Sequence, residues 1–533
     1  MSFTPNAVIE STQRFGMSTA APPPPTCRRA LPTALTATLM VAALTGRGEA
    51  QSQWVLRGLL EAETGNFQAA FGAHIIETGA YLIISEPGAE VQLDLESGKV
   101  HIYQGPQRTR ISTLTAPDLP PDASFGSFLV LDDTILAIGA PGAGKQYSLG
   151  GAVYFFDITD PAHPTYVRTL VRPERERDDS FGSALAINED LMIVGAWGSS
   201  LAAFVAGATF VFAKDTHELL ATVLASDATE ADHFGQETVL DGASLYITAP
   251  SADSGVEHVG AVYVYDITDP AQPIETIKLT SVDQQSGDSF GSSIAVDGDD
   301  LFIGEARSGR RGKKGHVYRL DKRTLELKTL YTSNTGDWQD VFGAEVAVSE
   351  TLVAVSAFGD EVNIARPGAV YLFDRASGTQ LIRLTPHDWA TTSKVGRDVC
   401  FSAAGEVIVS TGAEAGVGDV RFFTTQPVSV FTELSGNCPG RMTLRVTNAT
   451  PNGVVYLLFG RYAGTEFAPI VYCRTTQLNV VDPYHPSAPY LGVADASGVF
   501  EVTLPVEAAL CGDIFLQAVD TSTCRPSELL RVE

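Results

Sequence analysis

The sequence predicts an all-β protein in which a seven-bladed β-propeller is followed by a small C-terminal Ig-like β-sandwich. A Phe-Gly pair recurs at intervals of 52–56 residues over most of the chain. Each interval contains short runs of β-branched and aromatic residues that are separated by turn residues, a pattern typical of antiparallel sheets. The recurrence stops near residue 427 and is followed by alternating apolar and polar runs, which indicate a second all-β domain.

The first 50 residues are expected to be a signal peptide, with Met17 as an alternative start. Arg28 and Arg29 precede an uncharged stretch over residues 30–46, and the small-x-small site Gly48-Glu49-Ala50 follows it. This is the order of a secretory signal. The stretch is short and rich in Thr, which argues against a membrane span. We therefore expect a mature chain that is secreted, extracellular or located in the periplasm or cell envelope, with no membrane span after signal removal.

The composition excludes two broad classes of protein. With 44% hydrophobic and 19% charged residues, the chain has the make-up of a globular protein and not of a disordered one. The 36 basic and 63 acidic residues give a net charge of -27, which repels the phosphates of nucleic acids. We expect no nucleic-acid partner.

Seven copies of one unit occupy residues 51–427. Each copy has a Phe-Gly pair, then a segment of small residues about 14 positions later, then a variable loop and an aromatic strand that begins with Gly. The pairs are Phe71-Gly72, Phe125-Gly126, Phe181-Gly182, Phe234-Gly235, Phe290-Gly291, Phe342-Gly343 and a degenerate Val395-Gly396. A four-stranded sheet of this size cannot bury both of its faces alone, so the seven copies are predicted to stack in a closed ring.

The repeats resemble FG-GAP repeats, which are the units of the integrin α-subunit propeller and of many exported bacterial proteins. The resemblance rests on pairs such as Phe125-Gly126 followed by Gly139-Ala140-Pro141, and it covers residues 51 to about 427. It implies the propeller fold and does not imply a particular ligand.

The phase of the repeat predicts how the ring closes. In each period, one strand precedes the Phe-Gly pair and belongs to the previous blade. The segment Trp54 to Leu60 occupies that position before the first pair, whereas the seventh copy ends at its aromatic strand, Asp419 to Phe423. The N-terminal strand is therefore predicted to complete the last blade.

Residues 428–533 form the predicted sandwich, which contains the four cysteines Cys438, Cys473, Cys511 and Cys524. An even set in an exported segment predicts two disulfides. A strand between Cys511 and Cys524 holds these two apart, which leaves two pairings. We prefer Cys438 with Cys524 and Cys473 with Cys511, and the alternative is Cys438 with Cys511 and Cys473 with Cys524. Cys400, in an apolar strand pattern, is expected to be a buried, inert thiol.

No catalytic residue, metal ligand or cofactor site is predicted. An integrin-type calcium loop resembling DxDxDGxxD is missing, and the turn that comes nearest to it, Asp297-Gly298-Asp299-Asp300, has too few ligands for a calcium cage. A solvated turn is the favoured interpretation. An Asp also recurs two positions before the Phe-Gly pair, where binding to its own turn is favoured over a metal site. These residues are Asp179, Asp232, Asp288 and Asp340.

Strand alternation places the long loops on one face of the ring, and function commonly lies in such loops. The most unusual is the basic loop of residues 307–315, with Arg307, Arg310, Arg311, Lys313 and Lys314 as candidate binding residues. We expect an exported, monomeric, non-catalytic binding or adhesion protein whose loop-rich face recognises a protein or glycan on the cell surface or in the matrix. The alternative is a secreted polysaccharide hydrolase or lyase with paired carboxylates at the channel.

Overall fold

The computed structural model describes residues 52–531, apart from short segments, and every regular element in the described part is a β-strand. The segments not described are 63–68, 93–94, 119–121, 144–149, 173, 175–177, 254–255, 257, 283, 285, 307–313, 335–339, 361–367, 385–394, 412–417, 428–430, 437–439, 448–453, 468–476, 484–489, 494–499, 507–514, 521–524 and 527–529. No helix among the described residues is long and apolar enough to cross a membrane.

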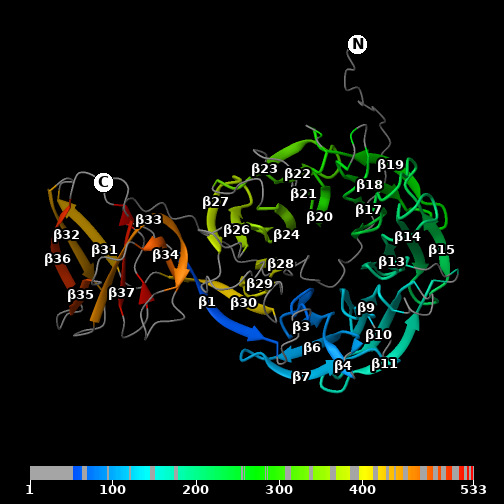
Figure 1. Ribbon diagram of the computed structural model, residues 1–533, viewed down its shortest axis with the longest axis horizontal. Coiled ribbons are helices and arrows are strands. Elements are labelled where there is room, and N and C mark those ends of the chain that lie inside the picture. Colours follow the sequence, from blue (N-terminus) through cyan, green and yellow to red (C-terminus); the bar gives the residue numbers. More distant parts are fainter. Residues whose placement is uncertain are drawn as a thin grey trace, which may run out of the picture.

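Seven four-stranded antiparallel sheets are arranged in a ring, as predicted (Figure 1). Blade 1 contains β2 (Ile75–Glu77), β3 (Tyr81–Glu86), β6 (Lys99–Gln104) and β7 (Thr109–Leu114), and blade 2 contains β8 (Phe128–Asp132), β9 (Ile135–Ala140), β10 (Ala152–Asp157) and β11 (Thr165–Leu170). Blade 3 contains β12 (Ala184–Ile187), β13 (Leu191–Ala196), β14 (Ala208–Ala213) and β15 (Leu219–Val223). Blade 4 contains β16 (Thr238–Asp241), β17 (Ser244–Ala249), β18 (Ala261–Asp266) and β19 (Ile274–Leu279). Blade 5 contains β20 (Phe290–Asp297), β21 (Asp300–Glu305), β22 (His316–Asp321) and β23 (Leu327–Tyr331). Blade 6 contains β24 (Phe342–Val348), β25 (Leu352–Ala357), β26 (Ala369–Asp374) and β27 (Gln380–Leu384). Blade 7 contains β28 (Val395–Phe401), β29 (Val407–Thr411), β30 (Asp419–Pro427) and β1 (Ser52–Glu61).

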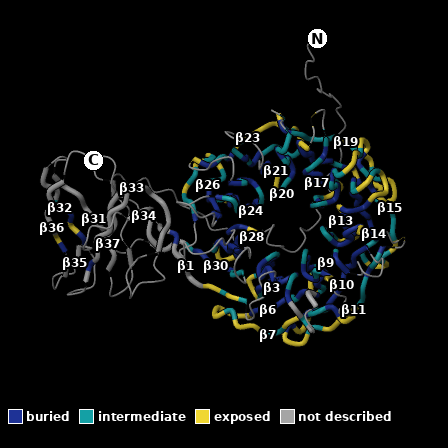
Figure 2. The backbone as a smooth tube through the Cα atoms, in the orientation of Figure 1, coloured by how far each residue is buried: buried dark blue, intermediate teal, exposed yellow. Residues whose placement is uncertain are grey.

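Burial explains why the strands differ in composition. The two middle strands of a blade are covered on both faces by neighbouring blades, so β13 is buried at every position and reads as a continuous apolar run. The fourth strand lies at the perimeter, where half of the residues of β11 are exposed. Figure 2 shows the same gradient, with dark blue inside the ring and yellow toward its edge. Blade 1 differs in carrying an additional hairpin, β4 (Glu90–Gln92) with β5 (Leu95–Glu96).

The Phe-Gly pair joins each blade to the one before it. Gly151, at the start of the third strand of blade 2, forms a parallel bridge with Phe181 of blade 3. A Cβ atom on Gly151 would lie 2.2 Å from the Phe181 carbonyl oxygen, and the φ angle of Gly151 is +113°. Only glycine allows this approach between the two backbones. The glycine of the pair is constrained in the same way, since Gly182 has a φ angle of +91° and its Cβ would lie 2.5 Å from the Ala152 carbonyl oxygen of blade 2. Positive φ angles recur at the glycine of every pair, and this explains why the pair recurs in the sequence.

The phenylalanine of each pair fills the core of its own blade. Phe125, for example, is fully buried, and its ring centroid lies 5.5 Å from that of Tyr154 on the third strand. Edge-on packing of this kind adds to the stabilisation that burial of the rings gives.

The N-terminal strand closes the ring, which confirms the prediction from the repeat phase. Strand β1 pairs antiparallel with β30, from Ser52 opposite Pro427 to Glu61 opposite Asp419. Trp54 is buried in the hydrophobic cluster shared by blades 6 and 7. The glycine contact also continues across this seam, since a Cβ on Gly418 would lie 2.7 Å from the Phe71 carbonyl oxygen of blade 1.

Beyond residue 430, the described strands form two sheets, which Figure 1 shows beside the propeller. The three-stranded sheet contains β31 (Phe431–Gly436), β32 (Gly440–Thr447) and β36 (Phe500–Val506). The other contains β33 (Val454–Phe467), β34 (Gln477–Pro483), β35 (Tyr490–Val493), β37 (Phe515–Asp520), β38 (Arg525–Pro526) and β39 (Leu530–Arg531). An Ig-like packing of the two sheets remains an expectation.

The cysteine predictions have different outcomes. Cys438, Cys473, Cys511 and Cys524 lie outside the described residues, so the structure does not test their pairing. Cys400 is fully buried, as expected, but it is disulfide-bonded. The prediction of an inert free thiol at this position was therefore wrong: the apolar pattern of β28 predicted burial correctly, but burial says nothing about oxidation.

Candidate functional site

The long loops and the connections between blades lie together on one face of the ring. A backbone hydrogen bond shows this directly: the Ala231 N–H, in the connection between β15 and β16, donates to the Phe204 carbonyl oxygen, in the loop between β13 and β14, at 2.9 Å. The turn between β20 and β21 lies at the opposite end of its strands.

The structure describes only one member of the predicted basic loop. Arg307, Arg310, Arg311 and Lys313 lie outside the described residues. The ammonium of Lys314 donates to the carbonyl oxygen of the buried Ser333 at 2.9 Å. Lys314 therefore fastens its loop to the next interblade connection.

The turn nearest to a calcium loop is neutralised by cations from other strands. Asp297 pairs with Arg375, which comes from the turn after β26 in the next blade. Asp300 pairs with Arg375 and Arg319, each at 2.7 Å, and with Lys328 at 2.9 Å. The turn is therefore a junction between blades, and the expectation that it is simply solvated was incomplete.

The pKa of Asp300 reflects this surrounding. Burial by itself raises the pKa of the carboxyl, but hydrogen bonds from Arg319, Arg375 and Lys328 outweigh it and lower the pKa to about 2. Asp300 is thus ionised at every physiological pH. Since these cations compensate its charge, the turn does not need a metal ion for neutrality.

The recurring Asp before each Phe-Gly pair is buried in all four copies. Asp232 accepts hydrogen bonds from the Thr229 N–H at 2.6 Å and from its hydroxyl at 2.7 Å. Asp179 forms an ion pair with Arg172 in the same connection. The favoured interpretation of a carboxylate that binds its own turn is confirmed for Asp232, whereas Asp179 pairs with an arginine seven residues earlier in the chain.

The first strands of several blades carry buried acids that could have formed a catalytic pair at the channel. Asp398 instead accepts the N–H of Ile75 in the next blade at 2.7 Å. Glu237 accepts the N–H of Ile294, also in the next blade, at 3.2 Å. Both carboxylates therefore fasten neighbouring blades. Among the described residues, no group of three or more His, Cys, Asp or Glu side chains is placed to hold a metal ion.

Five exposed apolar side chains lie in the loops and connections of blades 3 to 5 on the loop face. We call this set the apolar arc, and it consists of Trp197, Leu201, Phe204, Val256 and Val282. The first three lie in the loop between β13 and β14, Val256 lies between β17 and β18, and Val282 lies between β19 and β20. Phe204 exposes 67% of its surface, which is unusual for a residue of its size.

Histidine contacts connect these loops into one surface. The ring of Trp197 packs edge-on against His233, with centroids 5.1 Å apart. His233 Nδ1 lies 3.2 Å from the Ser251 hydroxyl, and His258 Nδ1 lies 3.2 Å from the Ser251 carbonyl oxygen. The Gly287 N–H, in the following connection, donates to the His258 carbonyl oxygen. The arc is therefore held by hydrogen bonds from blade 3 to the start of blade 5.

The charge state of His233 suits a binding surface. Burial, followed by the effect of the neighbouring His258, lowers the pKa of His233, although Asp232 acts in the opposite direction. The imidazole of His233 is therefore neutral at pH 7, and the Trp197 ring packs against an uncharged side chain.

Sequence reasoning did not identify the apolar arc. Composition alone cannot distinguish an exposed Phe from a buried one, whereas the charge of the basic loop is visible in the sequence. A signal was nevertheless present: the loop after β13 contains Trp197, Leu201 and Phe204, although such loops are normally polar.

The comparison with protein families agrees with the geometry. The model of the FG-GAP repeat matches residues 165–212, 274–320 and 332–373. The first match begins at β11, the outer strand of blade 2, and ends within β14 of blade 3, so a sequence repeat spans parts of two blades. No curated protein matches the chain. The three matched repeats and the seven-bladed ring together show that this chain is an FG-GAP β-propeller protein.

Proposed function

We propose that the protein is an exported, non-catalytic binding or adhesion protein that recognises a protein partner through the apolar arc. The observation that carries this proposal is the gathering of five exposed apolar side chains on hydrogen-bonded loops of one face. Single exposed apolar residues need no explanation, whereas several of them on neighbouring loops of one face favour an interaction surface.

The composition of the arc favours a protein ligand. Trp and Phe are large side chains that give much contact area when a partner covers them, and Trp is among the residues that dominate binding energy at interfaces. Hydrogen bonds between the described residues of these loops order them before binding, which reduces the conformational entropy lost on binding. The net charge of -27 would attract a partner with a basic rim and increase the association rate.

A binding array of cell-surface proteins and glycans, probed with the mature chain with and without calcium, tests the proposal. The variant Phe204→Ser should lose at least about tenfold in affinity for any positive protein, in line with the loss of one interface aromatic. The matched control is Ile274→Ser on the outer strand β19, where the side chain is 64% exposed but lies outside the arc. Equal binding by Phe204→Ser and the native chain would contradict the proposal, as would an equal loss in the control.

We also propose export, and a C-terminal sandwich that serves as a spacer or attachment domain. The signal-like order of residues 28–50 and the alternating strands after residue 430 support this. The mature protein should begin at Gln51, which N-terminal sequencing of the exported chain would test. Non-reducing peptide mapping should link Cys438 to Cys524 and Cys473 to Cys511. A peptide linking Cys511 to Cys524 would refute this pairing.

A further inference from the structure

One arginine at the start of the last blade stands where the other blades carry small or neutral residues. Arg397 follows Gly396 directly and belongs to β28, the first strand of blade 7. The corresponding residues of blades 1 to 6 are Ala73, Ser127, Ser183, Gln236, Ser292 and Ala344. Since six blades fold without a charge at this position, the repeat itself does not require Arg397.

The path of β28 directs Arg397 toward the inside of the ring. The first strand of each blade lies nearest the centre, as Figure 1 shows for β20, β24 and β28. Val399 packs in the cluster shared with blade 6, and Cys400 packs in the cluster shared with blade 1. Arg397 belongs to neither cluster and is the exposed residue of β28, at the register shift between Val395 and Val399. A bulge of this kind redirects a side chain, which leaves Arg397 on the inner side of the ring.

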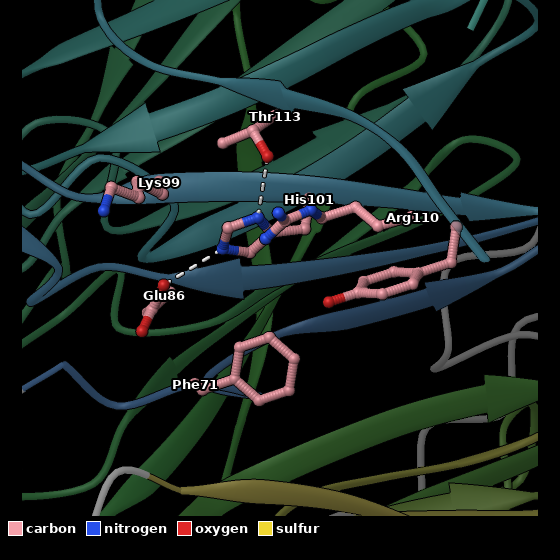
Figure 3. A pocket seen from close by; sticks show the side chains of 7 residues that line it. Phe71, Glu86, Lys99, His101, Arg110 and Thr113 are labelled. Carbon is pink, nitrogen blue, oxygen red and sulfur yellow. Dashed lines mark hydrogen bonds and ion pairs between the residues drawn. The ribbon is translucent and has the colours of Figure 1, made fainter. Parts of the chain in front are cut away.

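Arg397 also differs from other arginines of the propeller in its lack of a partner. Among the described residues, its guanidinium forms no hydrogen bond and no ion pair. Partly or fully buried arginines elsewhere are paired with carboxylates: Arg108 with Glu406, Arg172 with Asp179, Arg319 and Arg375 with Asp300, Arg383 with Asp360, and Arg421 with Asp419. The imidazole of His101, beside a cavity of about 230 Å³ in blade 1, is likewise hydrogen-bonded on both sides, to Glu86 and Thr113 (Figure 3). A ligand that binds Arg397 therefore displaces no described side chain from it.

The surroundings of Arg397 disfavour a free charge. Burial lowers the pKa of its guanidinium, while the carboxylate of Asp398 acts in the opposite direction. Both oxygens of Asp398 are used by the backbone, because they accept the N–H of Ile75 at 2.7 Å and the N–H of Val399 at 2.8 Å. The guanidinium of Arg397 is thus accessible to solvent and yet surrounded by protein atoms, as in a concave site. A desolvated cation without a bound counter-charge costs stability, and such groups are typical of functional sites.

We propose that Arg397 anchors a site, separate from the apolar arc, that binds a small molecule through its carboxylate. The planar guanidinium donates two parallel hydrogen bonds, which match the two oxygens of a carboxylate. One carboxylate neutralises the one positive charge. A dianion such as sulfate would leave an excess negative charge beside Asp398, in a protein whose net charge is already -27. A position on the inside of the ring favours a free small molecule over a side chain on the surface of a folded partner.

The test is a titration of the full mature chain with acetate at constant ionic strength, followed by the transverse relaxation of the acetate methyl protons. Binding should accelerate this relaxation in a saturable manner, whereas the neutral acetamide should show no saturable change. Formate should displace acetate, and sulfate should do so at least about tenfold less effectively. Arg397→Gln should abolish the saturable change without lowering the thermal midpoint, because it removes a charge that no described residue pairs with. Arg397→Lys keeps the charge but loses the planar fork, so acetate should bind at least about threefold more weakly.

Two variants serve as matched controls. Arg323→Gln removes an exposed arginine that is paired with Asp299, and it should leave acetate binding unchanged. Phe204→Ser in the apolar arc should also leave it unchanged, so failure of this site and failure of the proposed function are separate results. Absence of saturable binding, or equal binding by Arg397→Gln and the native chain, would overturn the site. A thermal midpoint lowered by several degrees in Arg397→Gln would overturn it in favour of a structural ion pair with Asp398, and equal displacement by sulfate and formate would overturn the assignment of a carboxylate.

Discussion

Replacing Trp54 with alanine should destabilise the propeller by removing a buried apolar contact of the closing strand. Trp54 is only 8% exposed and packs in the cluster of blades 6 and 7. A buried aromatic of this size covers roughly 200 Å², which at ~25 cal/mol per Å² corresponds to about 5 kcal/mol as an upper bound. Truncations of buried Phe or Trp to Ala cost about 3–5 kcal/mol, so we expect a loss in that range.

The assay is thermal unfolding followed by circular dichroism. An unfolding entropy of about 2.1 cal/mol/K per residue over roughly 370 propeller residues gives ~0.8 kcal/mol/K, so the midpoint should fall by about 4–6 °C. The matched control is Leu59→Ala on the same strand, where the side chain is 44% exposed. This control should shift the midpoint by about 1 °C or less. An unchanged midpoint for Trp54→Ala, or equal shifts for both variants, would refute closure through β1.

Three further predictions concern the joints between blades and the acidic turn. Gly151→Ala should lower the free energy of unfolding by at least about 3 kcal/mol, because its Cβ would lie 2.2 Å from the Phe181 carbonyl oxygen. The control Gly242→Ala has no atom within 4 Å of its Cβ and should lower it by only about 1–2 kcal/mol, because the backbone there is left-handed. Equal losses for the two variants in urea unfolding would contradict the interblade contact. The lowered pKa of Asp300 stabilises the fold above pH ~4, and this stabilisation is lost as the pH falls toward about 2. Arg375→Ala should therefore move the acid-unfolding midpoint to higher pH. The control Arg323→Ala removes an exposed ion pair with Asp299 and should not move it. Identical acid-unfolding midpoints for the two variants would argue against the junction between blades at Asp297 and Asp300. Chelation of calcium should leave the melting temperature within error, and a large decrease would show that the acidic turns or the recurring Asp residues bind metal.

The repetitive part of the fold was predictable because each blade imposes the same requirements on its sequence. The Gly of each Phe-Gly pair is needed where two backbones meet, so its recurrence gave the number of blades. The phase of the Trp54 strand gave the closure, since a strand without a blade of its own has only one partner left. Both predictions follow from local constraints that appear in the chain as a period.

Contacts between distant residues were not predictable from one sequence. Arg375 lies 78 residues from Asp297, and nothing in either segment indicates that they pair. The exposure of Phe204 depends on how its loop folds back, which residue type alone does not determine.

Hydrogen exchange of the C-terminal part of β30 tests the closed ring most directly. Strand β29 pairs with Val420–Phe423, whereas Thr424, Thr425 and Gln426 pair only with β1 among the described strands. A ring closed by β1 predicts slow exchange for amides in this segment of the full chain, and loss of that protection when residues 51–62 are deleted. Exchange of residues 424–426 within seconds in the full chain, as at an open sheet edge, would contradict the account.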